Sequence, residues 1–598
     1  MPARELTLDP RAEYVRRIAA WDRRIAEHDR THAILANSRL TIAAIAAVLL
    51  VLSIRTALSG WWLLVPVAVF AVLAVVHAKV LEHAERARRA RRLYERGLDR
   101  LDDRWAGKGR NGARFLDAHP YAKDIDLFGS GSLFELVNTT RSDAGEATLA
   151  SWVRASAPVS EVRARQTAVA ELMPRLDFRE DLAALAADAQ RGDTERLLSW
   201  AASAPFICGP WVPVLLGGSA AIVLVLAAAF WWNPRAWPLL IVWVLVQSGV
   251  VAMWRRRQGL RRAIPISERD LRLVAGLLDR LEREPFAAPW LIDRHTRLTS
   301  AGGSAAHAVN RLRGFVSLLD SFSDNLFFIP IGRLLFVHEQ LLLAIERWRH
   351  AHGPSMDGWL RAAGEIEAMT ALACYAYERH ADPFPEIVDD GILFDAKALG
   401  HPLIADGVSV RNDLHIGDGA PQVLVVSGSN MSGKSTLLRA VGVNVALALA
   451  GAPVRAASLR LSQLSIGATL RIEDSLQEHR SRFFAEIVRI RDILEIARDG
   501  QALIFLLDEI LHGTNSYDRR IGAEAIVRGL VGYGAIGLVT THDLALTEIV
   551  PQLSGAAANV HFEDRLEHGQ MVFDYRMRPG VVEHSNALAL MRAVGLEV

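Results

Sequence analysis

The sequence predicts a C-terminal α/β domain with a mostly parallel sheet, preceded by an all-α region that carries two transmembrane helical hairpins. Three observations predict this fold class. Apolar runs occur in two close pairs, and their lengths are near the ~20 residues that a helix needs to cross a bilayer. Apolar residues recur with helical periodicity from residue 256 to residue 383. Beyond Pro383, short apolar strands alternate with helices, which is typical of a parallel sheet covered by helices.

Composition limits the class of protein. The 598 residues exceed one ordinary domain. The formal net charge of +1 gives no global field that would indicate nucleic acid or an acidic partner. Two cysteines, Cys208 and Cys374, exclude a disulfide framework and favour a reducing, cytosolic setting for the soluble parts. The mean hydropathy of +0.17 is high for a soluble protein and favours membrane segments.

The apolar runs form two hairpins. The first comprises Leu40–Ile54 and Leu58–Val76, and the second Trp211–Trp232 and Trp237–Met253. Tryptophans gather near the ends of the runs, as in an interfacial aromatic belt. Buried core helices are the alternative, but charge-free runs in two close pairs favour four membrane spans.

Arginine placement predicts the orientation. Arginines are frequent before the first hairpin and after both hairpins, whereas the two short loops carry one each, Arg55 and Arg235. We therefore expect a multi-pass protein of the cytoplasmic (inner) membrane, with both termini and the α/β domain in the cytoplasm. The first ~39 residues are polar and charged, so no cleavable signal peptide is expected.

The chain divides into seven expected parts. They are a charged cytoplasmic helix (1–38), the first transmembrane hairpin (39–77), a basic helical stalk (78–120), a helical segment (121–207), the second hairpin (208–255), further helices (256–383) and the α/β domain (384–598).

The segment Gly428–Ser435, GSNMSGKS, fits the phosphate-binding P-loop pattern between the apolar run Val423–Val426 and a helix-like run, Thr436–Leu449. Backbone N–H groups of such a loop and the helix N-terminus bind phosphate oxygens. Lys434 is expected to reach the β- and γ-phosphates of ATP. A Gly/Ser-rich turn is the alternative, but further nucleotide-site residues follow in order. The expected ATP-binding residues of the loop are Gly428, Ser429, Asn430, Met431, Ser432, Gly433, Lys434, Ser435 and Thr436.

Two apolar strands end in polar residues with catalytic potential. Ala502–Leu507 ends in Asp508 and Glu509, the Walker B arrangement. We expect Asp508 and Ser435 to hold Mg²⁺ and Glu509 to activate the attacking water. A second strand, Ala535–Val539, is followed by His542, which can contact the γ-phosphate or the water. The expected catalytic residues are Glu509, His542 and Lys434, and the alternative for each is an ordinary surface or core position.

These motifs resemble those of the MutS family of ABC-class ATPases. The resemblance is specific over about residues 395–598 and weaker over Leu133–Leu172, which is similar to the start of that family's helical core. The stretches that carry it are the P-loop Gly428–Ala440, the Walker B and D-loop Asp508–Asp518, the Thr540–Asp543 switch, Ser481–Ile487, and Phe573–Leu596.

The resemblance implies an ABC/MutS-type ATPase domain and a homodimer in which Ser481, Asn515 and Ser516 face the partner's nucleotide. The family's mismatch-reading domain has no counterpart here, and membrane hairpins stand in its place. The aromatic residue that stacks on adenine in the family would fall near Ser409, which leaves the base contact open.

Three functions follow as hypotheses. The leading one is a membrane-anchored MutS-like ATPase in which ATP binding and hydrolysis drive a dimeric conformational switch. The alternative is a DNA-binding repair-type ATPase, for mismatched or branched DNA, held at the membrane. Any DNA binding is expected to be weak and without mismatch preference, because the mismatch-reading domain has no counterpart and the net charge is only +1. Contact with anionic lipid is the alternative explanation of the Arg-rich stalk. An ABC transporter is disfavoured, because the L-S-G-G-Q signature is missing.

Overall fold

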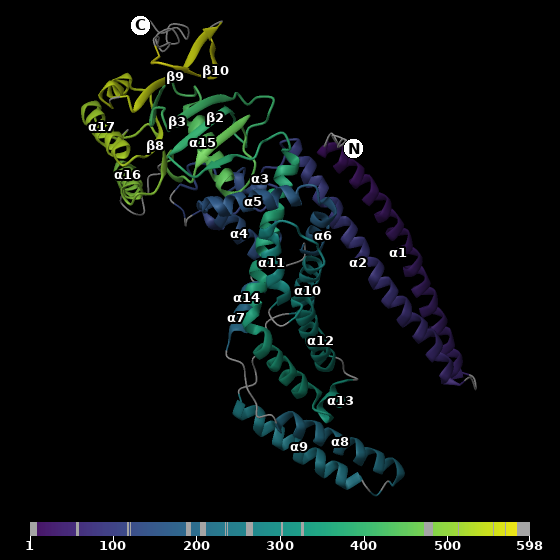
Figure 1. The fold of residues 1–598 in the computed structure, drawn as a ribbon. Helices are drawn as coiled ribbons and strands as arrows, with labels where there is room; N and C mark the ends of the chain where they lie inside the picture. The colour runs from purple at the N-terminus through teal and green to yellow at the C-terminus, as the bar shows by residue number, and fades with distance from the viewer. Residues whose placement is uncertain are drawn as a thin grey trace.

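The structure is a computed structural model in which a long helical region leads into a compact α/β domain (Figure 1). It describes residues 9–55, 59–116, 119, 121–186, 193–203, 211–233, 235, 237–258, 267–300, 303–324, 328–471, 482–511, 513–553, 555–567 and 570–582.

The first hairpin consists of two long helices that lie side by side (Figure 1). α1 (Pro10–Arg55) joins the charged N-terminal segment and the first apolar run in one continuous helix. The short turn η1 (Gly60–Leu63) leads into α2 (Leu64–Leu101), which continues from the second apolar run into the basic stalk. The compositional boundaries at residues 38 and 77 therefore fall inside helices. Large apolar side chains of both runs are exposed, as expected of a surface that meets lipid.

The second hairpin consists of α8 (Trp211–Trp232) and α9 (Trp237–Gln258). Among the described residues, α1, the stretch Gly60–Leu101 and α8 are long and apolar enough to cross a membrane. Sequence placed a fourth span at Trp237–Met253, but the apolar part of α9 with described side chains, Trp237–Gly249, is shorter than the other three. A different fourth candidate is the pair α13 (Phe328–Leu334) and α14 (Val337–Glu378), which is bent by 73° at a short break.

The remaining helices of this region pack mostly around α14 (Figure 1). α10 shows why they form: Ser267 and Asp270 make a capping box, and Leu271, Leu278 and Leu281 form a buried stripe at helical spacing. The helices are α3 (Leu133–Val137), α4 (Asp143–Arg154), α5 (Val159–Leu172), α6 (Leu176–Ala186), α7 (Asp193–Ala202), α10 (Glu268–Glu282), α11 (Pro289–Ser300) and α12 (Ala305–Asp324), with a short turn η2 (Ala113–Phe115).

The α/β domain contains two sheets. The six-stranded sheet has the order β10-β9-β4-β8-β7-β6, in which all neighbours are parallel except β10 and β9. This agrees with the mostly parallel sheet expected from sequence. The strands are β4 (Val423–Ser427), β6 (Ser465–Thr469), β7 (Leu503–Asp508), β8 (Ile536–Thr541), β9 (Ala557–Glu567) and β10 (Gln570–Pro579).

The second sheet was not predicted. It has the order β1-β5-β2-β3, and its central strand β2 is antiparallel to both neighbours. These strands are short and only partly buried, so their apolar pattern is weak. Their bounds are β1 (Glu386–Val388), β2 (Leu393–Leu399), β3 (Asn412–Gly417) and β5 (Ser458–Ser462).

Helices cover both faces of the six-stranded sheet. Successive side chains of each buried strand point to opposite faces, so each strand contributes to two hydrophobic cores. Leu424 and Leu506 belong to the core shared with α15 (Lys434–Ala450) and the helical region. Val425 and Phe505 belong to the separate core under α16 (Arg482–Arg498) and α17 (Ser516–Gly532). The 3-10 segment η4 (Leu544–Leu553) follows β8.

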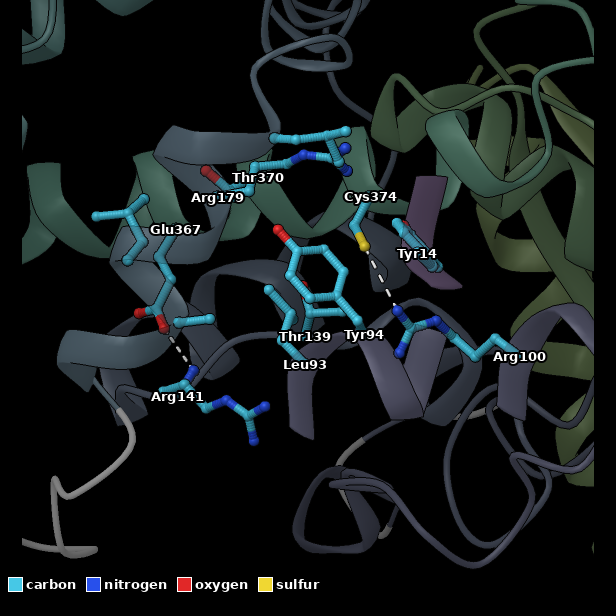
Figure 2. Close-up of a pocket in the computed structure, with 13 residues that line it drawn as sticks. Tyr14, Leu93, Tyr94, Arg100, Thr139, Arg141, Arg179, Glu367, Thr370 and Cys374 are labelled. Atoms are coloured by element: carbon cyan, nitrogen blue, oxygen red, sulfur yellow. Dashed lines mark hydrogen bonds between the residues drawn. The ribbon is translucent and has the colours of Figure 1, made fainter. Parts of the chain in front are cut away.

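The stalk and α14 are joined by a buried ion pair next to the α/β domain. The Arg100 guanidinium donates to Glu378 with an Nε–Oε2 distance of 2.6 Å, and Tyr14 Oη donates to the same carboxylate at 3.1 Å. Burial works against the charge of Arg100, but Glu378 raises its pKa above the usual value. Figure 2 shows Arg100 directed at Cys374, with Tyr14 and Tyr94 nearby. The end of α2, the start of α1 and the end of α14 therefore meet at one point.

Removing the carboxylate of this pair should destabilise the protein strongly. Glu378→Ala leaves the buried Arg100 charge uncompensated, and such a loss costs about 3–5 kcal/mol of unfolding free energy. Chemical unfolding of the detergent-solubilised protein measures it. Asp357→Ala breaks the exposed pair with Arg361 on the same helix and should cost at most ~1 kcal/mol. Equal losses in the two variants would contradict a structural role for the buried pair.

Candidate nucleotide site

A cavity of about 450 Å³ lies at the carboxyl end of β4, where the P-loop enters α15. This volume falls within the ~300–1,000 Å³ of small-molecule sites. The carboxyl ends of parallel strands are where α/β proteins bind ligands. The cavity is lined by Leu399, Gly400, His401, Ile404, Val408, Ser409, Val410, Asn412, Ser429, Asn430, Met431, Gly433, Lys434, Ser435, Thr436, Leu437, Ala440, Glu509, Phe562 and Tyr575.

The P-loop conformation depends on its glycines. Gly433 is the residue before α15 and has φ +106°, a region that side chains rarely adopt. At Gly428, with φ +152°, a Cβ atom would lie 2.9 Å from Ser432 Oγ. Met431 has φ +71° and is solvent-exposed. The loop thus makes a tight turn whose backbone borders the cavity.

Lys434 is buried inside this loop. Its Nζ donates to the backbone carbonyls of Gly428, at 2.7 Å, and Ser429, at 2.8 Å. Burial lowers the pKa of Lys434, and the carboxylates of Glu509 and Asp508 act in the opposite direction. The lysine and both carboxylates are therefore close enough to interact electrostatically.

Two hydroxyls of the loop fit a phosphate ligand. Ser429 Oγ and Ser432 Oγ are buried and have no hydrogen-bond partner within the described part of the chain. A buried hydroxyl without a partner costs about 1–3 kcal/mol, so such atoms are rare unless a ligand or water completes them. Phosphate oxygens at the loop would accept these hydrogens, and the loop therefore fits the group that sequence assigned to it.

The two carboxylates are positioned by the neighbouring strand. Asp508 ends β7 and is the register partner of Thr540 on β8. The Thr540 hydroxyl donates to Asp508 Oδ1 and accepts from the backbone N–H of Glu509 at 3.1 Å. Glu509 has φ +47°, a strained value that this contact helps to hold. His542 Nδ1 lies 3.2 Å from Glu509 Oε1.

The structure thus places the expected residues Lys434, Glu509 and His542 around one site. Ser435 lines the same cavity. No group of three or more His, Cys, Asp or Glu side chains that could hold a metal occurs among the described residues. Ser435 and Asp508 are the residues that would hold Mg²⁺ together with the phosphates of a bound nucleotide, because Mg²⁺ prefers few carboxylates plus substrate oxygens.

The expected partner-facing residues are only partly described. Ser481 lies outside the described residues, and so does the side chain of Ser516. Asn515 has a role within its own chain, because its side chain caps α17 by accepting from the backbone N–H of Asp518 at 2.9 Å. Glu486, which sequence reasoning did not single out, is buried and accepts from the backbone N–H of Leu511 at 2.6 Å.

Sequence reasoning also missed the aromatic wall of the cavity. Ser409 lines the cavity as expected, but the aromatic side chain comes from Tyr575 on β10. A Cβ atom on Gly433 would lie 3.2 Å from Tyr575 Cδ1, so the ring lies over the P-loop. Asn412 holds this bulged part of β10 by donating to the Tyr575 carbonyl at 3.0 Å and accepting from Met577 N–H at 2.7 Å. The sequence signal that could have indicated this aromatic contact was the pair Phe573 and Tyr575.

Comparison with known proteins agrees with this geometry. Residues 424–597 match the family model of MutS domain V. The DNA mismatch repair protein MutS of Dinoroseobacter shibae is 30% identical over 273 residues, which cover 44% of this chain and 31% of that protein. The DNA mismatch repair protein MutS 2 of Haloarcula marismortui is 32% identical over 238 residues, which cover 36% of this chain and 24% of that protein. The matched region thus spans about a third or less of these relatives. The C-terminal region of this chain is thus similar to MutS domain V, and this similarity supports membership of the MutS family.

Proposed function

We propose that this protein is a membrane-anchored MutS-like ATPase in which ATP binding and hydrolysis drive a dimeric conformational switch. The observation that carries the proposal is a cavity lined by Lys434 and Glu509, with His542 beside Glu509 and with two loop hydroxyls that have no partner among the described residues. Family membership supports it, because the match falls on the domain that contains this site.

Each side chain has a role in hydrolysis that follows from its position. Lys434 leaves the carbonyls of Gly428 and Ser429 and donates to the β- and γ-phosphates. Glu509 accepts a proton from the attacking water. His542, in contact with Glu509, orients that carboxylate and responds to the γ-phosphate. Mg²⁺ held by Ser435 and Asp508 would neutralise charge that develops on the phosphates.

Tyr575 is proposed to supply the base contact. Tyr575 is 43% exposed, and its ring lies over the loop and lines the cavity. A planar base that enters the cavity with its phosphates on the loop can stack on this ring. The stacking residue that sequence sought near Ser409 would thus come from the opposite wall.

Membrane anchoring and dimerisation complete the proposal. The apolar side chains of α1, α2, α8 and α9 are largely exposed, which is costly in water and favourable in lipid. The two hairpins would hold neighbouring chains at a high effective concentration, which favours a dimer with composite nucleotide sites. Ser481, Asn515 and Ser516 remain the proposed contributions to the partner's site.

DNA binding is the second candidate, because both relatives are named DNA mismatch repair proteins. If DNA binds, its affinity should come from arginine–phosphate contacts and fall steeply with salt. A salt-resistant preference of tenfold or more for a mismatched over a matched duplex would favour this candidate over the membrane switch.

Substitutions at the loop and at the carboxylate should separate binding from hydrolysis. Lys434→Ala should weaken ATP binding as well as turnover, because it removes charge from the phosphate cradle. Glu509→Gln should keep ATP bound and lower turnover about 100-fold or more. Nucleotide binding and phosphate release by the detergent-purified protein measure these effects, and the exposed Glu548→Gln is the matched control. Wild-type turnover by Glu509→Gln would refute the catalytic assignment.

The Tyr575 ring should contribute to nucleotide affinity. Base–aromatic stacking is worth about 1–3 kcal/mol, so Tyr575→Ala should weaken ATP binding roughly 5- to 150-fold, whereas Tyr575→Phe should retain it. The dissociation constant of a fluorescent ATP analogue is the measurement. Tyr517→Ala, which removes an exposed ring on α17, should have no effect. Unchanged affinity in Tyr575→Ala would mean that the base binds elsewhere.

Both hairpins should return to the cytoplasm. Reporter fusions at the N-terminus, near residue 110 and at Val598 should all read as cytoplasmic. Cysteines introduced at Ser59 and Asn233, in the short hairpin turns, should react with a membrane-impermeant reagent from outside the cell. An external reading at Val598 would overturn this topology and would leave the nucleotide site without ATP.

A further inference from the structure

The N-terminal end of α14 exposes more apolar side chains than is usual for a helix in a soluble domain. α13 and α14 meet at a 73° bend, and the residues around the bend, 328–337, are Phe-Ile-Pro-Ile-Gly-Arg-Leu-Leu-Phe-Val. Phe328 is 45% and Ile331 48% exposed. We call residues 328–340 the lever tip. It thus presents an apolar surface in which Arg333 is the one arginine or lysine.

Glutamine side chains bind two backbone carbonyls at the break between α13 and α14. Gln247 Nε2 of α9 donates to the Leu334 carbonyl at 3.2 Å, and Gln340 Nε2 donates to the Leu335 carbonyl at 3.1 Å. Phe336 between them has φ +54° and is buried. At the surface of a soluble protein, water would satisfy these groups. In lipid they need protein partners, because each unsatisfied group costs several kcal/mol.

Gln247 also connects the tip to both helices of the second hairpin. It is only 6% exposed, and its Oε1 accepts from Ser219 Oγ of α8 at 2.8 Å. Val223 of α8 is fully buried, whereas its neighbours Leu224 and Val225 are exposed. α8 contacts α14 and lies near the lower end of the helical region (Figure 1). One strip of the hairpin is therefore covered, and the rest is free for lipid.

The position of Gln247 along α9 sets the depth of the tip. Gln247 lies about ten residues after Trp237, which is ~15 Å along a helix, and this is near the middle of a ~30 Å hydrocarbon layer. A hairpin that crosses the bilayer therefore carries Gln247 to mid-membrane. The Leu334 carbonyl, 3.2 Å from its amide, must lie at the same depth.

We propose that the lever tip is itself a membrane element, which enters the bilayer beside the second hairpin as a re-entrant segment and contacts lipid acyl chains through Phe328 and Ile331. Gln247 is its polar anchor. This inference rests on the membrane anchoring proposed above and adds what the lever contacts: α14 runs unbroken from the tip to Glu378, so it links the bilayer directly to the nucleotide-binding domain.

Quenching by brominated lipid tests the depth of the tip. Single cysteines at Ile331, at Leu224 of α8 and at Ile292 of α11 would carry a fluorophore in the full chain with Cys208→Ala, reconstituted in vesicles with bromines at mid-chain. All three side chains are exposed in the structure. The parent without an added cysteine corrects for Cys374. We expect strong quenching at Ile331 and Leu224, and none at Ile292.

The other outcomes separate the two proposals. Quenching at Leu224 but not at Ile331 overturns the tip inference and leaves the anchoring intact; a tip that binds DNA or another protein would give this result. Absence of quenching at both positions overturns the anchoring itself.

The role of Gln247 has its own test. Gln247→Leu makes α9 more apolar, so insertion of the hairpin is preserved while the donor to the Leu334 carbonyl is lost. We expect most of the quenching at Ile331 to disappear while that at Leu224 stays unchanged. Unchanged quenching at Ile331 would show that Gln247 does not anchor the tip.

Discussion

The buried pair of Arg100 and Glu378 is the interaction on which the arrangement of the whole chain depends. Glu378 ends α14, and β1 of the α/β domain begins a few residues later. Because Arg100 ends the stalk and Tyr14 binds the same carboxylate, the first hairpin is fixed to the helix that enters the nucleotide-binding domain. An ion pair of this kind adds little net stability, but it tolerates only one geometry, since displacement of either partner exposes an uncompensated charge to an apolar surrounding. Movement of the C-terminal end of α14 therefore has to carry the first hairpin with it.

A second buried carboxylate fixes the opposite side of that domain. Asp124 accepts from the backbone N–H groups of Leu470 and Arg471 and from Arg489 of α16. Burial raises the pKa of Asp124, and the Arg489 charge opposes this shift. The contact joins the helical region to the segment that precedes Ser481 and to the helix that carries Glu486. Glu486 holds Leu511 beyond the Walker B residues, so α16 contacts both that loop and, through Arg489, the helical region.

The predictability of each part follows from the range of the interactions that form it. A local sequence pattern was enough to predict the P-loop and the buried strands β4, β7 and β8. The candidate site residues lie within or next to these segments, so the same patterns indicated them. Tyr575 could not be predicted in this way, because its place over Gly433 depends on a bulge held by Asn412 from a distant strand. The four-stranded sheet was missed for a similar reason, as its short strands gain stability only from pairing. The fourth membrane candidate was missed because a break divides the apolar residues of α13 and α14, and one hydrogen bond at this break comes from Gln247 of a helix distant in sequence.

The nature of the lever tip bears on what a nucleotide-driven movement can act upon. A surface that binds DNA needs several cationic side chains for the phosphates, because counterion release supplies most of the non-specific affinity. The tip offers Arg333 and His338 as its basic side chains, with phenylalanine, isoleucine and leucine around Arg333, and glutamine amides bind two of its carbonyls. These features suit a segment inside a bilayer, and they give little affinity for a phosphate backbone. A tilt of α14, fixed at one end by Glu378, would move this apolar end against lipid and the second hairpin. The physical chemistry of the tip thus favours a membrane over nucleic acid as its contact.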